Sequence, residues 1–267
     1  MNNPIALCVD RNPFESIEKL IPLVAGVGFA GIEWHEGGME ERWTNSETAA
    51  TIRDLSRKSE LACQYHAPYA ESFDLGQEEG ALRAPDSVAG VIAHMLDRAD
   101  RLGARLVTTH VGSCPPEANR SEALQTIVEG IRIVSPELEK RGIRLALENL
   151  TPGSSDMPLG TLAEDFDVLM ASIPSEWVGQ TIDVAHAYLC GNLLDFLARP
   201  LDRLFNVHLH DNHGESDEHL PVGKGNIPLD EVLGRLSEVG YRGPMTFEFL
   251  TEADVYLDAI GRVRCCN

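Results

Sequence analysis

Residues 142–149 read Gly-Ile-Arg-Leu-Ala-Leu-Glu-Asn, and this segment is the clearest indication of the fold class. Gly142 ends a long helical pattern, residues 144–148 form a short β-rich run, and Glu148 closes that run with a carboxylate. A helix stop followed at once by a strand predicts a β/α unit. The same stop recurs at Gly28, Gly103 and Gly240, each just ahead of another strand candidate.

On both sides of this segment, strand and helix patterns alternate along the whole chain. The strand candidates are Pro4–Asp10, Gly31–His35, Ala62–His66, Leu106–His110, Arg144–Glu148, Gly179–Asp183, Phe205–Leu209 and Pro244–Phe249. The helix candidates are Phe14–Val27, Thr48–Lys58, Asp86–Leu102, Ser121–Arg141, Leu162–Ile173, Leu193–Leu197, Leu229–Val239 and Ala253–Val263. Such alternation predicts a parallel sheet with crossover helices.

Eight β/α units in a chain of 267 residues predict a (β/α)8 TIM barrel that spans residues 1–267 as a single domain. The structural alternative is a doubly wound open sheet, which usually carries a glycine-rich turn after its first strand. Asp10-Arg11-Asn12-Pro13 stands at that position and is no such turn.

Composition limits the partners. The formal net charge is −20, from 42 acidic and 22 basic residues, which argues against a nucleic-acid partner. The N-terminus lacks the features of a signal peptide and no apolar stretch is long enough to span a bilayer. We therefore expect a cytoplasmic protein that does not enter membranes, and a homo-oligomer is compatible with the sequence. The six cysteines form no C-x-x-C pair, which argues against a zinc ribbon.

The histidines are placed unevenly. Only His94 falls inside a predicted helix, whereas the other eight lie at predicted strand ends or just past them: His35, His66, His110, His186, His208, His210, His213 and His219. In a barrel those strand ends converge on one mouth, where active sites are built. A single strand-end histidine is more often structural, but eight together predict a site.

Carboxylates join the histidines at the same level. Glu148, Asp183 and Glu248 end three predicted strands, and Asp217 forms an Asp-x-His pair with His219. A buried carboxylate among apolar neighbours is costly unless it is paired or bound to a metal. Imidazole and carboxylate together suit zinc, manganese or cobalt. The pattern therefore predicts a site for one or more divalent metal ions.

These residues carry a resemblance to a known superfamily. The chain resembles the xylose isomerase-like barrels, which include sugar isomerases, sugar epimerases and the endonuclease IV family. The most specific stretches are Val207–Asn212, with a His-x-x-Asp pattern, and Asp217–Ile227, with a Gly-x-Gly turn.

The resemblance implies a set of metal ligands. A metal shared across the superfamily would be held by Glu148, Asp183, His208 and Glu248, with His210 as the rival to His208 because it lies one strand period away. Endonuclease IV enzymes hold three zinc ions with five further ligands, and residues of the matching type stand here at His66, His110, His186, Asp217 and His219.

Two enzyme functions follow from the resemblance. The first is isomerisation or epimerisation of a sugar or sugar phosphate, in which a metal stabilises an enediolate while Glu148 and Glu248 move protons next to a carbonyl. His186 would then bind a substrate hydroxyl. The second is phosphoester hydrolysis by clustered zinc ions, with Tyr69 resembling a tyrosine that contacts DNA in endonuclease IV.

Charge favours the small-molecule substrate, because DNA binding depends on Lys and Arg. In addition, Gly37–Glu41 stands where endonuclease IV carries an arginine-bearing loop. We further predict Trp34, His210 and Lys224 as substrate-binding residues, with Lys224 as a candidate phosphate contact. A barrel that binds a ligand without chemistry is the third hypothesis, and the complete ligand set argues against it.

Overall fold

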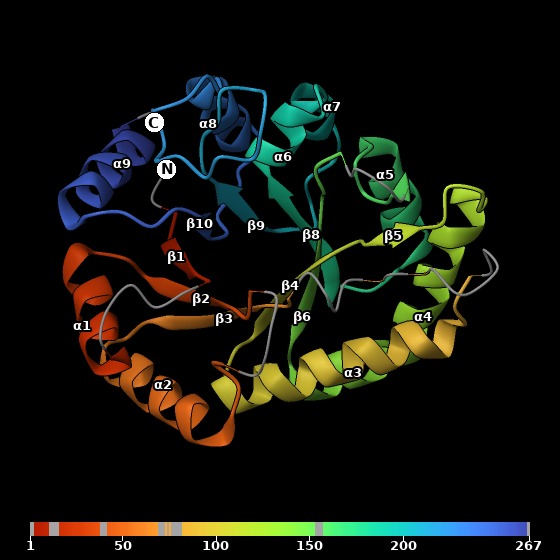
Figure 1. The fold of residues 1–267 in the computed structure, drawn as a ribbon, viewed down its shortest axis with the longest axis horizontal. Helices are drawn as coiled ribbons and strands as arrows, with labels where there is room; N and C mark the ends of the chain where they lie inside the picture. The colour runs from red at the N-terminus through yellow and green to blue at the C-terminus, as the bar shows by residue number, and fades with distance from the viewer. Residues whose placement is uncertain are drawn as a thin grey trace.

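The computed structural model describes residues 3–10, 16–37, 42–68, 73, 75, 82–152 and 157–265. Eight parallel strands close into a barrel in the order β1-β10-β9-β8-β6-β4-β3-β2 (Figure 1). Their bounds are β1 Ile5–Val9, β2 Gly31–His35, β3 Ala62–His66, β4 Leu106–His110, β6 Arg144–Glu148, β8 Val178–Asp183, β9 Leu204–Leu209 and β10 Met245–Phe247. The predicted (β/α)8 barrel is therefore confirmed.

Helices surround the barrel (Figure 1). Their bounds are α1 Ile17–Val27, α2 Ser46–Lys58, α3 Pro85–Leu102, α4 Arg120–Arg141, α5 Ala163–Ser172, α6 Val184–Leu189, α7 Leu193–Ala198, α8 Leu229–Glu238 and α9 Ala253–Cys265. Helices α1, α3 and α4 end where predicted, because Gly28, Gly103 and Gly142 take the left-handed conformation that closes a helix. The predicted start of the first helix, Phe14, lies outside the described residues.

Two features of the mouth were not predicted. A two-stranded antiparallel sheet pairs β5, Ser113–Cys114, with β7, Met157–Pro158. The short helix α6 starts directly after β8, where the Asp183 side chain accepts a hydrogen bond from the backbone N–H of His186 (2.7 Å) and caps the helix. Both features follow strand ends and therefore shape the surroundings of the predicted ligands.

The core has two parts with different chemistry. Apolar side chains fill the space between strands and helices, as in the fully buried Ile32, Val107 and Leu145. Inside the barrel, buried polar side chains form a layer below the mouth, comprising Glu33, Gln64, Thr108, Thr181, Asn206 and Thr246. Among the described residues, no helix is both long and apolar enough to cross a membrane.

Candidate active site

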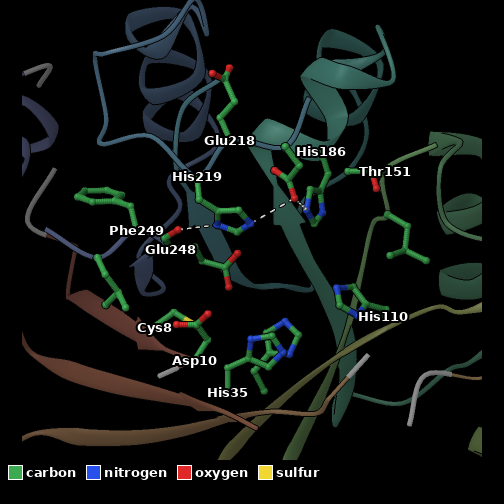
Figure 2. Close-up of a pocket in the computed structure, with 14 residues that line it drawn as sticks. Cys8, Asp10, His35, His110, Thr151, His186, Glu218, His219, Glu248 and Phe249 are labelled. Atoms are coloured by element: carbon green, nitrogen blue, oxygen red, sulfur yellow. Dashed lines mark hydrogen bonds and ion pairs between the residues drawn. The ribbon is translucent and has the colours of Figure 1, made fainter. Parts of the chain in front are cut away.

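The mouth of the barrel holds a cavity of about 840 Å³. Five histidines and four carboxylates line it. Figure 2 shows His35, His110, His186, His219 and Glu248 gathered around one space. The charged or titratable side chains that line it are Cys8, Asp10, His35, His66, His110, His186, Asp217, Glu218, His219 and Glu248. Among the described lining residues there is no lysine or arginine.

The first cluster, which we call the central group, is Glu148, Asp183, His208 and Glu248. One ligand atom from each lies within 4.8 Å of the others, and all four residues are buried. His208 Nδ1 is 2.7 Å from Glu148 Oε1 and 3.2 Å from Glu248 Oε1. Donor separations near 3 Å are those that coordination bonds of about 2 Å to one ion produce. Oxygen and imidazole donors in this arrangement fit a divalent metal ion.

His208 and His210 hold different places around the central group. His210 Nε2 lies 3.1 Å from Asp183 Oδ2, and its ring stacks on that of His219 with centroids 4.1 Å apart. His210 forms metal-type clusters with Asp183 and His186, and with His219 and Glu248, whereas His208 clusters with all three carboxylates of the central group. The geometry thus favours His208 as the strand ligand. His210 is buried behind the ligands and is not among the lining residues, which argues against direct substrate contact.

A second cluster, the His66 group, comprises His66, His110 and Glu148. Glu148 Oε2 is 2.8 Å from His66 Nε2 and 3.3 Å from His110 Nε2. Glu148 itself is fully buried and is not a lining residue, whereas both imidazoles line the cavity. Glu148 therefore contacts His208 of the central group with one oxygen and the imidazoles of the His66 group with the other.

The third cluster, the loop group, is His186, Asp217 and His219. Asp217 Oδ2 lies 3.3 Å from His186 Nε2 and 3.2 Å from His219 Nε2, as the dashed lines in Figure 2 show. His186 comes from α6, whereas the other two come from the loop after β9. The three clusters together contain all nine residues that the resemblance implies as ligands.

Asp211 holds the loop that carries Asp217 and His219. Its carboxylate accepts hydrogen bonds from the backbone N–H of Gly223 (2.9 Å) and Ile227 (3.2 Å), and its backbone pairs with Leu220. Gly225 passes so close to Asn212 and Asp211 that a Cβ would overlap both. The His-x-x-Asp and Gly-x-Gly patterns thus close one loop, and the aspartate acts as its anchor.

The charges of the clusters balance one another. Burial opposes a charge on Glu148, but the imidazoles of His208, His110 and His66 outweigh it and hold its pKa well below the usual range. Burial also disfavours a charge on His66, yet Glu148 raises the pKa of His66 to about 9. Burial lowers the pKa of His110 to about 4. Protons on some imidazoles thus neutralise the carboxylates, a role that a divalent cation would take over.

Burial likewise disfavours a charge on His219, but the hydrogen bond to Asp217 raises the pKa of His219 to about 9. Burial raises the pKa of Asp217, but the neighbouring imidazoles of His186 and His219 outweigh burial and hold that pKa below the usual range. The loop group is therefore an ion-paired cluster whose protons compete with a metal ion.

Two further predicted substrate contacts, Trp34 and Lys224, do not line the cavity. Trp34 is fully buried and packs against Trp43, with ring centroids 5.1 Å apart, in the hydrophobic core rather than in the cavity. Because side chains alternate along a strand, the neighbours of Trp34 face the barrel interior and Trp34 faces the helices. Lys224 is exposed on the turn after β9 and is not among the residues that line the cavity. Tyr69 lies outside the described residues.

Two glutamates of the second β/α unit are buried and make contacts that the sequence did not predict. Glu33 lies fully buried on β2, with Oε1 3.0 Å from His208 Nε2. Glu36 is buried and accepts hydrogen bonds from the backbone N–H of Arg42 (2.8 Å) and Thr44 (3.1 Å). The signal for Glu33 was present, because it stands in an apolar strand as Glu148 does.

The chain is similar in sequence to a family of barrel proteins. The model of a family described as xylose isomerase-like TIM barrel matches residues 21–264. Fructoselysine 3-epimerase of Escherichia coli O157:H7 is 29% identical over 248 residues, which cover 88% of this chain and 86% of that protein. A probable endonuclease 4 of Thermoplasma acidophilum is 31% identical over 149 residues, covering 49% of this chain and 48% of that protein.

Among solved structures, a D-tagatose 3-epimerase-like protein superposes with a TM-score of 0.80 at 24% identity, covering 98% of this chain and 96% of that one. At this level of identity the likeness shows the fold alone.

Proposed function

Because this chain belongs to the xylose isomerase-like TIM barrel family, we propose that it is a divalent-metal-dependent isomerase or epimerase of a sugar or sugar phosphate. The observation that carries the proposal is the central group, in which Glu148 and Glu248 share a metal-type donor set with Asp183 and His208. Glu248 also lines the cavity, so a carboxylate stands where a substrate carbon would lie. The relationship to fructoselysine 3-epimerase supports this class of reaction.

Each residue then has a defined task. Glu248 removes the proton from the carbon next to the carbonyl, and Glu148 is the second acid–base group. His66 and His110, which contact Glu148, line the cavity. His186 lines the cavity and offers a ring nitrogen to a substrate hydroxyl. A divalent ion, zinc or manganese, held by the central group would supply Lewis-acid polarisation of substrate oxygens.

The charge of the cavity supports a small substrate over DNA. Asp10 and Glu218 line it in addition to the clustered carboxylates, and the described lining residues include no basic side chain other than histidine. Phosphate backbones are held chiefly by lysine and arginine. A sugar, which binds through hydroxyl groups, suits this lining better than a polyanion does.

Phosphoester hydrolysis by clustered zinc ions is the second candidate function, and one observation favours it. The His66 group and the loop group are assembled in addition to the central group. A one-metal epimerase has no need of these five further donors. Clustered ions can activate water and stabilise a leaving oxygen.

Metal content per chain tests the two functions. Protein purified without added metal or chelator is analysed for elements and then assayed on a ketose panel and on abasic-site DNA. One zinc or manganese per chain with ketose turnover supports the epimerase, whereas three zinc ions with DNA cleavage refute it. Glu248→Gln should abolish turnover, while Glu218→Gln, which changes a lining carboxylate outside the clusters, should leave metal content unchanged.

A further inference from the structure

Glu33 is a buried carboxylate directly behind the central group. It lies on β2 with no exposed surface, and its Oε1 is 3.0 Å from His208 Nε2. Its Oε2 accepts hydrogen bonds from Asn206 Nδ2 (3.0 Å) and Thr108 Oγ1 (3.3 Å). Three neighbours from strands β4 and β9 thus converge on one side chain that does not itself line the cavity.

The orientation of Asn206 is determined by its other partners. Its Oδ1 accepts hydrogen bonds from the backbone N–H of Val207 (2.9 Å) and from Thr246 Oγ1 (2.9 Å). The amide nitrogen therefore points to Glu33, and Gln64 Oε1 lies 3.3 Å from that nitrogen as a second acceptor. Because the amide is held in this way, Asn206 Nδ2 donates to Glu33, and Glu33 Oε2 must act as the acceptor.

A buried carboxylate is costly unless donors surround it. A carboxylate oxygen accepts hydrogen bonds. Among the described residues, neither Glu33 Oε1 nor His208 Nε2 makes an aligned hydrogen bond, and their 3.0 Å contact is the polar contact open to both, which a small rotation of the ring would turn into an Nε2–H···Oε1 bond. The other ring nitrogen, Nδ1, donates to Glu148 Oε1, and a divalent ion in the central group would take the place of that hydrogen. Nδ1 is the atom that lies 2.7 Å from Glu148 Oε1 and 3.2 Å from Glu248 Oε1.

We propose that Glu33 is a positioning residue of the central group: it fixes the ring of His208 so that Nδ1, and not Nε2, faces the ion. Carboxylates that accept from a ligand histidine raise the affinity of the metal by orienting the ring and fixing its tautomer. The inference rests on the proposed function in one respect only, since it requires a divalent ion in the central group.

The test measures metal affinity rather than turnover. Glu33→Gln keeps the shape of the side chain, but its amide cannot accept from Asn206, Thr108 and His208 together. The affinity for Zn²⁺, measured by competition with a chromophoric chelator, should fall about 10- to 100-fold. The visible spectrum of the Co²⁺-loaded protein should change as well, because it reports the ligand geometry.

Glu36→Gln is the matched control. It makes the same substitution in a buried glutamate three positions away, whose carboxylate holds the backbone of Arg42 and Thr44 instead of a ligand. A purely structural effect would lower thermal stability in both variants and leave Zn²⁺ affinity unchanged in both. Reduced affinity confined to Glu33→Gln supports the inference.

Two other results decide against it. Wild-type affinity in Glu33→Gln overturns the inference alone, whereas a wild-type chain that binds neither Zn²⁺ nor Mn²⁺ overturns the proposed function and the inference together. If Glu33→Gln does not fold, Thr108→Val removes one donor to Glu33 with little change of shape. A smaller loss of affinity in Thr108→Val supports the inference, and an unchanged affinity overturns it.

Discussion

Asp211 anchors the loop that carries two ligands of the loop group, so its replacement should loosen that loop without unfolding the barrel. The carboxylate is 3% exposed and accepts from the backbone N–H of Gly223 at 2.9 Å and of Ile227 at 3.2 Å. Asp211→Asn keeps one oxygen for Ile227 but turns an amide N–H toward the N–H of Gly223. Losing a bond to a charged acceptor and opposing two donors should cost about 2–3 kcal/mol.

Native-state hydrogen exchange measures this cost directly. An opening free energy lowered by about 2–3 kcal/mol accelerates exchange at Gly223 and Ile227 roughly 30- to 150-fold. Amides of β6, which lie in the barrel, should keep their wild-type rates. Glu215→Gln, an exposed charge change in the same loop, is the control. Equal exchange rates at Gly223 in the two variants would refute the anchoring role.

Three further predictions concern the core, the protons and the metal. Trp34→Ala should lower the free energy of unfolding by about 3–5 kcal/mol in urea titrations and leave the KM of the folded enzyme unchanged; a raised KM with unchanged stability would contradict the core placement. The raised pKa of His66, about 9, means that its charge stabilises the metal-free fold below pH 6.5 and that this contribution is lost as the pH rises through 9. Urea unfolding of metal-free wild type and His66→Gln should therefore converge between these pH values, and a constant difference would contradict the ion pair. Chelation should lower the Tm of the purified protein and re-addition of zinc or manganese should restore it, because an ion bound only by the folded state stabilises that state; a Tm insensitive to both treatments would exclude a bound ion.

Much of the fold could be predicted because its units are local. Strands β2, β3, β4 and β6 begin and end at the predicted residues, since each is a short apolar run bounded by a helix stop or a polar side chain. The β5–β7 pair was missed because strands of two residues show no periodicity. Helix α6 was missed because its six residues depend on a cap from Asp183, a residue that the sequence presents first as a ligand.

The candidate site was predictable where residues stand at strand ends, and less so inside the barrel. Glu148 and Glu248 could be paired because both close apolar strands on the same mouth. Glu33 was overlooked because its partners, His208 and Asn206, lie more than 170 positions away in the chain. The burial of Trp34 could have been predicted from its neighbours. Side chains alternate along a strand, so Trp34 points to the opposite side of β2 from Glu33 and His35.

The loop group differs from the other clusters in the structural elements that position its residues. Three residues of the central group lie in barrel strands and Glu248 directly follows a fourth, β10. Asp217 and His219 instead lie in a loop that Asp211 holds at its base. Exchanging residues 212–226 would therefore change how many ions the barrel can hold without disturbing the rest of its architecture. We therefore expect the number of ions that this chain binds to depend on the loop more than on the barrel strands, so that related barrels can differ in metal number while they share one fold.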